Sequence, residues 1–187
     1  MKHTGTVNLE TKDLLLRRFE VTDAEAMYKN YANDPEVTKF LTWPVHENAR
    51  ASAQLLAAWV EEYADPSVYN WAIVDKALGE VIGGISIVKA DETVGMLHVG
   101  YCLGRAFWHR GYMTQALTAV RDHLFREVGI DRLEARHDPN NPHSGAVMRK
   151  CAMVYEGTLR RSGRNNQGIV DEAYYGLLRE EWERLAE

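Results

Sequence analysis

The chain has 187 residues, of which 45% are hydrophobic, and a formal net charge of -5 at pH 7. This length suits one well-buried domain over 1–187 better than two. The negative net charge argues against a protein that binds nucleic acid phosphates through an overall positive charge. A local basic patch is still compatible with it. The two cysteines, Cys102 and Cys151, provide neither a disulfide framework nor a CxxC zinc motif.

The apolar residues are spread along the chain rather than gathered in one long run. No stretch approaches the length of about eighteen residues that a membrane-spanning helix needs. The opening "MKHTGTVNLE" also lacks the apolar segment of a signal peptide. Together with the cysteine count, this composition predicts a cytoplasmic protein with a cationic small-molecule or peptide partner and no membrane partner.

The first half of the chain carries strand and helix signals in alternation. The residues "TDAE" have capping-box spacing, which predicts that Thr22 caps a helix ending near Asn33. Apolar residues at helical spacing predict a longer helix within 46–65. The remaining expected elements are a strand at 13–19, a short helix at 34–41, a hairpin of strands at 70–75 and 80–90, and a third strand at 96–104.

The second half reads as helix, strand, helix and a closing pair of strands. An apolar stripe predicts a helix over 112–129, with Gly129 placed to end it. A helix that joins two strands usually makes them parallel neighbours, so the strands at 96–103 and 131–138 are expected to run parallel. A helix at 141–152 and antiparallel strands at 153–162 and 169–180 complete a mixed α/β (α+β) fold.

The stretch "FWHRGYMTQALTAV" places cations and a glycine directly before the helix at 112–129. The first turn of a helix has unpaired amide groups and a positive dipole end, which together favour an anion such as a diphosphate. Gly111 would allow close backbone approach, and His109, Arg110 and Arg105 would add donors. The alternative is that Gly111 only makes a turn and the charged side chains are solvated.

Two longer stretches, "HVGYCLGRAFWHRGYMTQAL" and "DPNNPHSGAVMRKCAM", resemble the GCN5-related N-acetyltransferases (the GNAT family). Within that family the likeness is to the ribosomal-protein N-terminal acetyltransferase, or RimJ/RimL-like, branch. It extends to the N-terminal "LETKDLLLRRFEVTDAEAMYKNYANDPEVTKFL" and to the hairpin "WAIVDKALGEVIGGISI". The resemblance implies a mixed, mostly antiparallel sheet splayed open around acetyl-CoA, in agreement with the expected element order.

The resemblance also implies which residues contact acetyl-CoA. Backbone amides at 110–114 would hold the pyrophosphate, and backbone groups at 102–103 would pair with the pantetheine arm like an extra strand. The chain departs from the family's loop pattern where Trp108 replaces a Gln or Arg and Met113 replaces a second small residue. Backbone amides do not depend on side-chain identity, so binding is expected to survive both changes. The implied contacts are Cys102, Leu103, His109, Arg110, Gly111, Tyr112, Met113, Thr114, Asn141 and Ser144.

His98 is the first candidate for the general base. It stands in "HVGY", where the family often has a glutamate, and a histidine with a pKa near 6.5 suits proton transfer near neutrality. Strand alternation places it on the opposite side from Leu97, Val99, Tyr101 and Leu103. The alternative is a hydrogen-bonded structural histidine.

Ser144 occupies the position that the resemblance assigns as proton donor to the departing thiolate. The alternative is that it caps the helix that begins near Asn141, or faces solvent. The glutamate that the RimJ/RimL-like branch carries downstream of this serine falls at Gly163, so that base is missing.

For the other reactive or aromatic side chains, a structural role is weighed against a catalytic one. Cys102 lies four strand residues from His98, about 13 Å at about 3.3 Å per residue, so a Cys/His pair is excluded and direct transfer is expected. Tyr101 is expected in the core rather than in catalysis. Each of Trp43, Trp59 and Trp108 could line an acceptor cleft or belong to the core.

These observations predict an acetyl-CoA-dependent N-acetyltransferase that acts on a primary amine. An α-amino group has a pKa near 7.7 to 8.0 and is partly neutral at pH 7, whereas a lysine near 10.4 is almost fully charged, so a protein or peptide N-terminus is the easier acceptor. The alternatives are an acetylase of amino acids, polyamines or antibiotics, and a catalytically weak CoA-binding sensor. The acceptor is expected against 20–65 and 155–175, and the closing strands could support a homodimer.

Overall fold

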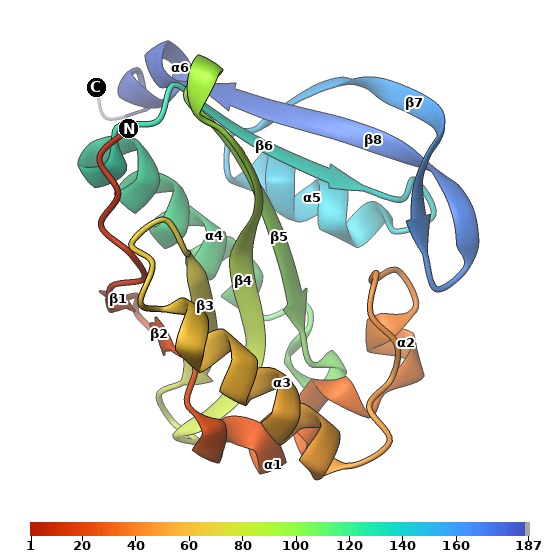
Figure 1. Cartoon of the computed structure of the whole chain (residues 1–187). Helices are drawn as coiled ribbons and strands as arrows, with labels where there is room; N and C mark the ends of the chain where they lie inside the picture. Colours follow the sequence, from red (N-terminus) through yellow and green to blue (C-terminus); the bar gives the residue numbers. More distant parts are fainter. Residues whose placement is uncertain (186–187) are drawn as a thin grey trace.

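The computed structural model describes residues 1–185 and contains an eight-stranded sheet flanked by helices (Figure 1). The strand order is β1-β2-β3-β4-β5-β6-β8-β7, with β5 and β6 parallel and the other neighbouring pairs antiparallel. The predicted mixed, mostly antiparallel sheet is therefore confirmed. The strands are β1 (Leu9–Glu10), β2 (Leu14–Arg18), β3 (Asn70–Asp75), β4 (Glu80–Asp91), β5 (Met96–Leu103), β6 (Arg132–His137), β7 (Val154–Asn165) and β8 (Gly168–Leu178).

The helices before residue 169 lie where the sequence predicts them, with short irregular turns between them, whereas α6 begins at Arg179, inside the segment 169–180 that the sequence predicts to be a strand. Gly129 ends the π-helical continuation of α4 in a left-handed conformation, with φ of 77°. The helices are α1 (Ala24–Met27), α2 (Pro35–Thr38), α3 (Ala49–Glu62), α4 (Tyr112–His123), α5 (Pro142–Lys150) and α6 (Arg179–Glu183), with 3-10 or π turns η1 (Val21–Asp23), η2 (Tyr28–Ala32), η3 (Glu92–Val94), η4 (Arg105–Phe107) and η5 (Leu124–Val128). Within residues 1–185 no helix is long and apolar enough to cross a membrane.

The expected capping role of Thr22 is wrong. Thr22 lies inside η1, and its hydroxyl donates to the Glu20 carboxylate at 3.3 Å. The Asp23 carboxylate accepts the Glu20 backbone N–H at 2.8 Å instead. Arg17, near the end of β2, holds that carboxylate through two hydrogen bonds of 2.7 and 2.8 Å.

Apolar side chains cover both faces of the sheet from β2 to β5. One cluster lies beneath α4 and includes Leu16, Trp71 and Leu117, all fully buried. A second cluster lies beneath α1 and α3 and includes Met27 and Leu56. Figure 1 shows these helices on opposite faces of the sheet. Strand alternation produces the arrangement, because successive residues point to opposite faces.

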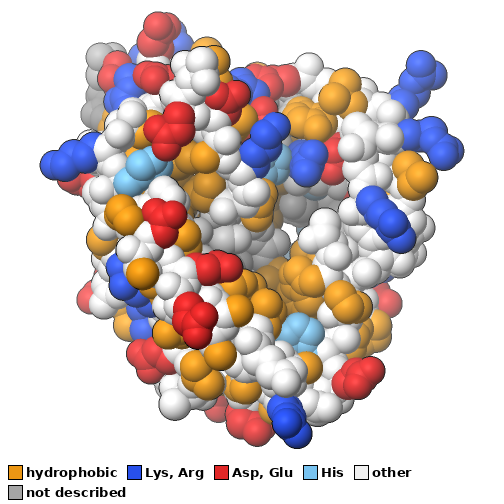
Figure 2. Space-filling model, viewed as in Figure 1, with side chains coloured by type: hydrophobic (Ala, Val, Ile, Leu, Met, Phe, Trp, Pro, Cys, Tyr) orange, Lys and Arg blue, Asp and Glu red, His pale blue; other side chains and the backbone are white. Residues whose placement is uncertain are grey.

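The sheet splits between β5 and β6. These strands pair only through Met96–His98 and Arg132–Glu134, and beyond that point they diverge (Figure 1). We call this point the fork. Beyond it, β6, β8 and β7 form an arm with α5 packed on one face. The face of the molecule in Figure 2 is hollowed beside this divergence.

The tip of the arm returns to the body of the molecule. The Asn166 side-chain amide donates to the Thr38 and Trp43 carbonyls, each at 2.8 Å, and the Asn166 backbone N–H donates to the Leu41 carbonyl at 3.1 Å. The turn between β7 and β8 is therefore fastened to the segment that follows α2. This contact holds the far end of the arm in place across the hollow.

Candidate active site

A cleft of about 320 Å³ lies at the carboxyl end of β5, between the first turns of α4 and α5 and the residues of α2. It includes the first turn of the helix before which the sequence predicts an anion site. Most of the predicted acetyl-CoA contacts line it: Cys102, Leu103, His109, Gly111, Tyr112, Met113, Thr114, Asn141 and Ser144. Arg110 does not line the cleft, but its guanidinium lies 5.7 Å from the ring centre of Phe107, which does.

The loop before α4 has the backbone geometry of an anion site. His109 and Gly111 are left-handed, with φ of 60° and 77°. No atom lies within 4 Å of the position that a Cβ on Gly111 would take, so the backbone is open to a ligand there. The first amides of α4 lack intrahelical partners and follow directly in the cleft wall. This arrangement fits a diphosphate. Arg105, expected beside the anion, instead forms an ion pair with Asp34 at 2.9 Å.

The tryptophans divide between the cleft and the core. Trp108 lines the cleft, and its indole N–H donates to the Leu103 carbonyl at 2.7 Å. That carbonyl therefore already has a partner, while Cys102 lies opposite Gly84 of β4. Trp59 packs against Phe19 with ring centres 5.1 Å apart and belongs to the core beneath α3.

Ser144 and Tyr101 form a hydroxyl pair in the cleft. The Ser144 hydroxyl donates to the Tyr101 oxygen at 3.1 Å, and the Tyr101 hydroxyl donates to the Ser144 carbonyl at 2.9 Å. Burial raises the pKa of Tyr101, while the hydrogen bond from Ser144 acts in the opposite direction. Tyr101 packs against the core as expected, but it also lines the cleft. Sequence reasoning missed this second role, although strand alternation points Tyr101 toward α5.

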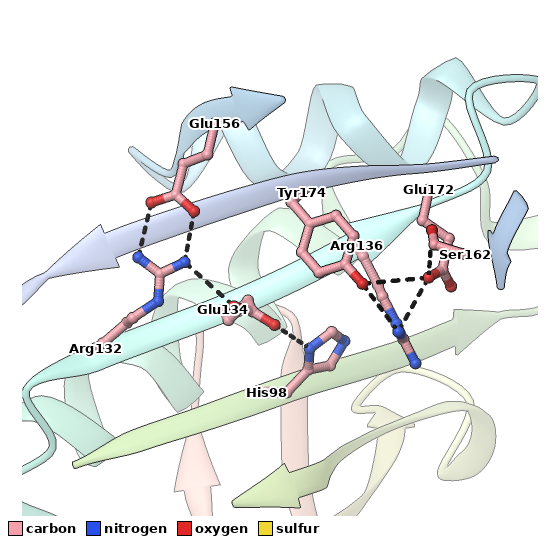
Figure 3. A network of polar contacts seen from close by, with 8 residues as sticks. All are labelled: His98, Arg132, Glu134, Arg136, Glu156, Ser162, Glu172 and Tyr174. Carbon is pink, nitrogen blue, oxygen red and sulfur yellow. Dashed lines mark hydrogen bonds and ion pairs between the residues drawn. The ribbon is translucent and has the colours of Figure 1, made fainter. Parts of the chain in front are cut away.

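His98 lies at the fork and outside the cleft wall. Its ring is 4% exposed, and its Nδ1 lies 2.9 Å from a Glu134 carboxylate oxygen (Figure 3). Burial lowers the pKa of His98, although the hydrogen bond with Glu134 opposes that shift. A carboxylate can only accept, so a neutral His98 carries its proton on Nδ1 and presents the lone pair of Nε2. This is the tautomer that a general base needs.

Glu134 orients His98 and is itself held in place. Arg132 donates to its second carboxylate oxygen at 3.2 Å. Burial opposes ionisation of Glu134, but the hydrogen bonds from His98 and Arg132 outweigh burial and lower its pKa. Glu134 is therefore an ionised partner for His98 at neutral pH. Sequence reasoning missed it, because the pair depends on the register of two strands that are far apart in the chain.

A second buried carboxylate lies on the same face of the arm. Glu172, 9% exposed, accepts hydrogen bonds from Arg136 at 3.0 Å and from Ser162 at 3.2 Å (Figure 3). A Cβ added to Gly163 would overlap its carboxylate. Glu172 thus fills the space of a side chain at 163, the position where the RimJ/RimL-like branch has its glutamate.

Burial works against Cys102 as a nucleophile. Burial raises the pKa of its thiol to about 12, and the backbone hydrogen bond with Gly84 only partly opposes the shift. A thiol with this pKa is protonated near neutrality, and the thiolate is the reactive form. The structure therefore favours direct transfer over an acetyl-cysteine intermediate.

Comparison with known proteins places the chain in a family. The Acetyltransferase (GNAT) domain profile matches residues 13–154. The "Uncharacterized N-acetyltransferase p20" of Bacillus licheniformis is 27% identical over 93% of this chain and 97% of its own length. The "[Ribosomal protein uS5]-alanine N-acetyltransferase" of Escherichia coli (strain K12) is 26% identical over 81% of this chain and 80% of its own length.

A solved structure shares the fold. The Microcin C7 self immunity acetyltransferase MccE, in complex with acetyl-CoA and AMP, superimposes with a TM-score of 0.79 at 21% identity, over 90% of this chain and 93% of that one. The profile match covers most of the sheet and all of the cleft wall. The chain therefore belongs to the GNAT family of N-acetyltransferases and is an enzyme that uses acetyl-CoA as its acetyl donor.

Proposed function

We propose that the enzyme transfers the acetyl group directly to the N-terminal amine of a protein or peptide. The observation that carries this proposal is the arrangement at the fork. The cleft with its hydroxyl pair lies on the side of α4 and α5, and the oriented His98 lies where β5 and β6 separate. Acetyl donor and amine can therefore approach the fork from opposite sides of the sheet.

The choice of an α-amine rests on the pKa of the base. Burial holds the pKa of His98 below its ordinary value of about 6.5. Such a base matches an amine with a pKa near 7.7 to 8.0 better than a lysine near 10.4. The similarity to an enzyme named for ribosomal protein uS5-alanine supports the same acceptor class.

The proposed reaction uses one proton acceptor and one proton donor. The amine nitrogen attacks the thioester carbonyl, a C–N bond forms and the C–S bond breaks. His98 Nε2 takes the proton that leaves the amine. The hydroxyl pair of Ser144 and Tyr101 supplies the proton that the CoA thiolate gains, and the pair regains a proton from solvent. First-turn amides of α4 and the side chain of Asn141 hold the donor, because these groups line the cleft.

A product-mass assay tests this proposal. Acetyl-CoA is incubated with peptides that begin with Ala, Ser or Met, with the same peptides N-terminally blocked but containing lysine, and with amino acids, polyamines and aminoglycosides. We expect acetylation of the free N-termini and no product from the blocked peptides. Product from small amines alone would contradict the acceptor class. Acetyl-CoA binding without any product would indicate a sensor.

A further inference from the structure

The edge strand β7 contains a large bulge. In its pairing with β8, Leu159 stands opposite Glu172 and Gly163 stands opposite Val170. Three residues of β7, at 160–162, therefore face the single residue Asp171. Extra residues in one strand leave the ladder and are pushed outward. The bulge places Arg160 and Arg161 on the outer surface, where both are exposed.

Specific hydrogen bonds hold the bulge in this shape. Arg161 has a left-handed φ of 51°, and its backbone N–H donates to the Asp171 carboxylate at 2.8 Å. The Ser162 hydroxyl shares its single proton between the Leu159 carbonyl at 3.1 Å and the Glu172 carboxylate at 3.2 Å. A left-handed conformation is unfavourable for a residue with a Cβ and persists only where the surroundings impose it. The outward direction of the arginines is thus a defined feature of the fold.

The arginines of β7 carry unneutralised charge. Arg160, Arg161 and Arg164 are exposed, and none forms an ion pair within residues 1–185. Figure 2 shows basic side chains on the arm formed by β7 and β8. The chain as a whole has a net charge of -5, so this local patch has the opposite sign. Exposed Leu159 and Ile169, at 55% and 61%, lie among these arginines.

The patch adjoins the acceptor side of the fork. Ser162, inside the bulge, donates to the Glu172 carboxylate at 3.2 Å. Glu172 binds Arg136, and both lie on the face of the arm that His98 approaches from β5 (Figure 3). An acceptor chain whose amine reaches the fork can therefore continue along β7.

We propose that Arg160, Arg161 and Arg164, with Leu159 and Ile169, bind an acidic segment of the acceptor protein that follows its N-terminus. This proposal rests on the proposed function. Opposite charge would steer such a segment to the enzyme and fix its direction. A second copy of this chain is disfavoured, because pairing two β7 edges would bring arginines together and the bulge interrupts the ladder. The apolar residues within the patch favour a protein over a nucleic acid.

The test compares two peptides with the same neutral N-terminal residues, one continuing in an acidic run and the other in a neutral Gly/Ser run. The variant R160E/R161E/R164E is expected to raise KM for the acidic peptide about tenfold or more, as three exposed ion pairs would give. kcat and the KM of the neutral peptide should not change. The matched control K2E/K12E/R126E makes the same charge change at exposed positions away from β7 and should leave both KM values unchanged.

A binding measurement separates this proposal from the proposed function. The fluorescence anisotropy of a labelled, N-terminally blocked acidic peptide measures binding to the patch, and the blocked peptide cannot be acetylated at its N-terminus. Binding that weakens with salt and is lost in R160E/R161E/R164E supports the patch even if no peptide is acetylated. Equal affinity for acidic and neutral peptides, or an unchanged affinity in that variant, would overturn it. Tighter binding of a single-stranded RNA than of the acidic peptide, lost in the same variant, would also overturn it.

Discussion

Replacing His98 by alanine is expected to lower kcat by about a hundredfold or more, the usual contribution of a positioned general base. The KM for acetyl-CoA should change little, because His98 lies outside the cleft wall. The His123→Gln variant serves as the control, since His123 is also buried but bonds to Thr4 at the N-terminal segment. Its kcat should remain close to that of the unmodified enzyme.

The pH dependence of kcat identifies the role of His98. The base acts when neutral, so kcat should fall as the pH drops through the pKa of His98, which burial places below its ordinary value. Glu134→Gln keeps an oxygen that can accept the His98 Nδ1–H but loses the negative charge that raises the pKa of His98, so the acid limb should move to lower pH. At pH 8 His98 is neutral in both proteins. A lower kcat of Glu134→Gln at this pH would therefore mean that the His98 ring is no longer held in position, and not that it is protonated. An unchanged kcat and acid limb in His98→Ala would contradict the assignment.

The hydroxyl pair gives the second large expected effect. Tyr101→Phe and Ser144→Ala should each lower kcat about ten- to a hundredfold, because the departing thiolate loses its hydrogen-bonded proton donor. The double variant should be little worse than the poorer single one, since the two hydroxyls act through one hydrogen bond of 3.1 Å. Initial rates at saturating acetyl-CoA measure this non-additivity.

Removing a tyrosine hydroxyl outside the cleft controls for a general loss of stability or folding. Tyr69→Phe removes a tyrosine hydroxyl that accepts the Thr4 backbone N–H at 3.1 Å, outside the cleft, and should leave kcat unchanged. Fully additive losses in Tyr101→Phe and Ser144→Ala would show that the hydroxyls act separately. Full activity in both variants would assign proton donation to another group.

Local sequence patterns predicted the parts of the site that are contiguous in the chain. The strand end, loop and helix start at 102–114 lie together along the cleft because a strand that runs into a helix brings its own neighbours with it. The glycine before the helix and the unpaired first-turn amides are likewise local features. The cleft could therefore be located from the sequence before any tertiary contact was known.

Contacts between distant strands could not be predicted in the same way. Glu134 meets His98 because β5 and β6 pair in one register, and Glu172 fills the space beside Gly163 because β8 lies between β6 and β7. Neither register follows from hydrophobic periodicity. The periodicity indicates which face of a strand is buried, but not which strand it pairs with.

The central claim is that the acetyl group passes directly from CoA in the cleft to an amine at the fork. Initial velocities measured over a grid of acetyl-CoA and peptide concentrations test it most directly. Direct transfer requires both substrates to be bound together, so double-reciprocal plots should intersect. Parallel lines, together with an acetylated enzyme detected by mass in the absence of peptide, would show a covalent intermediate and contradict the claim.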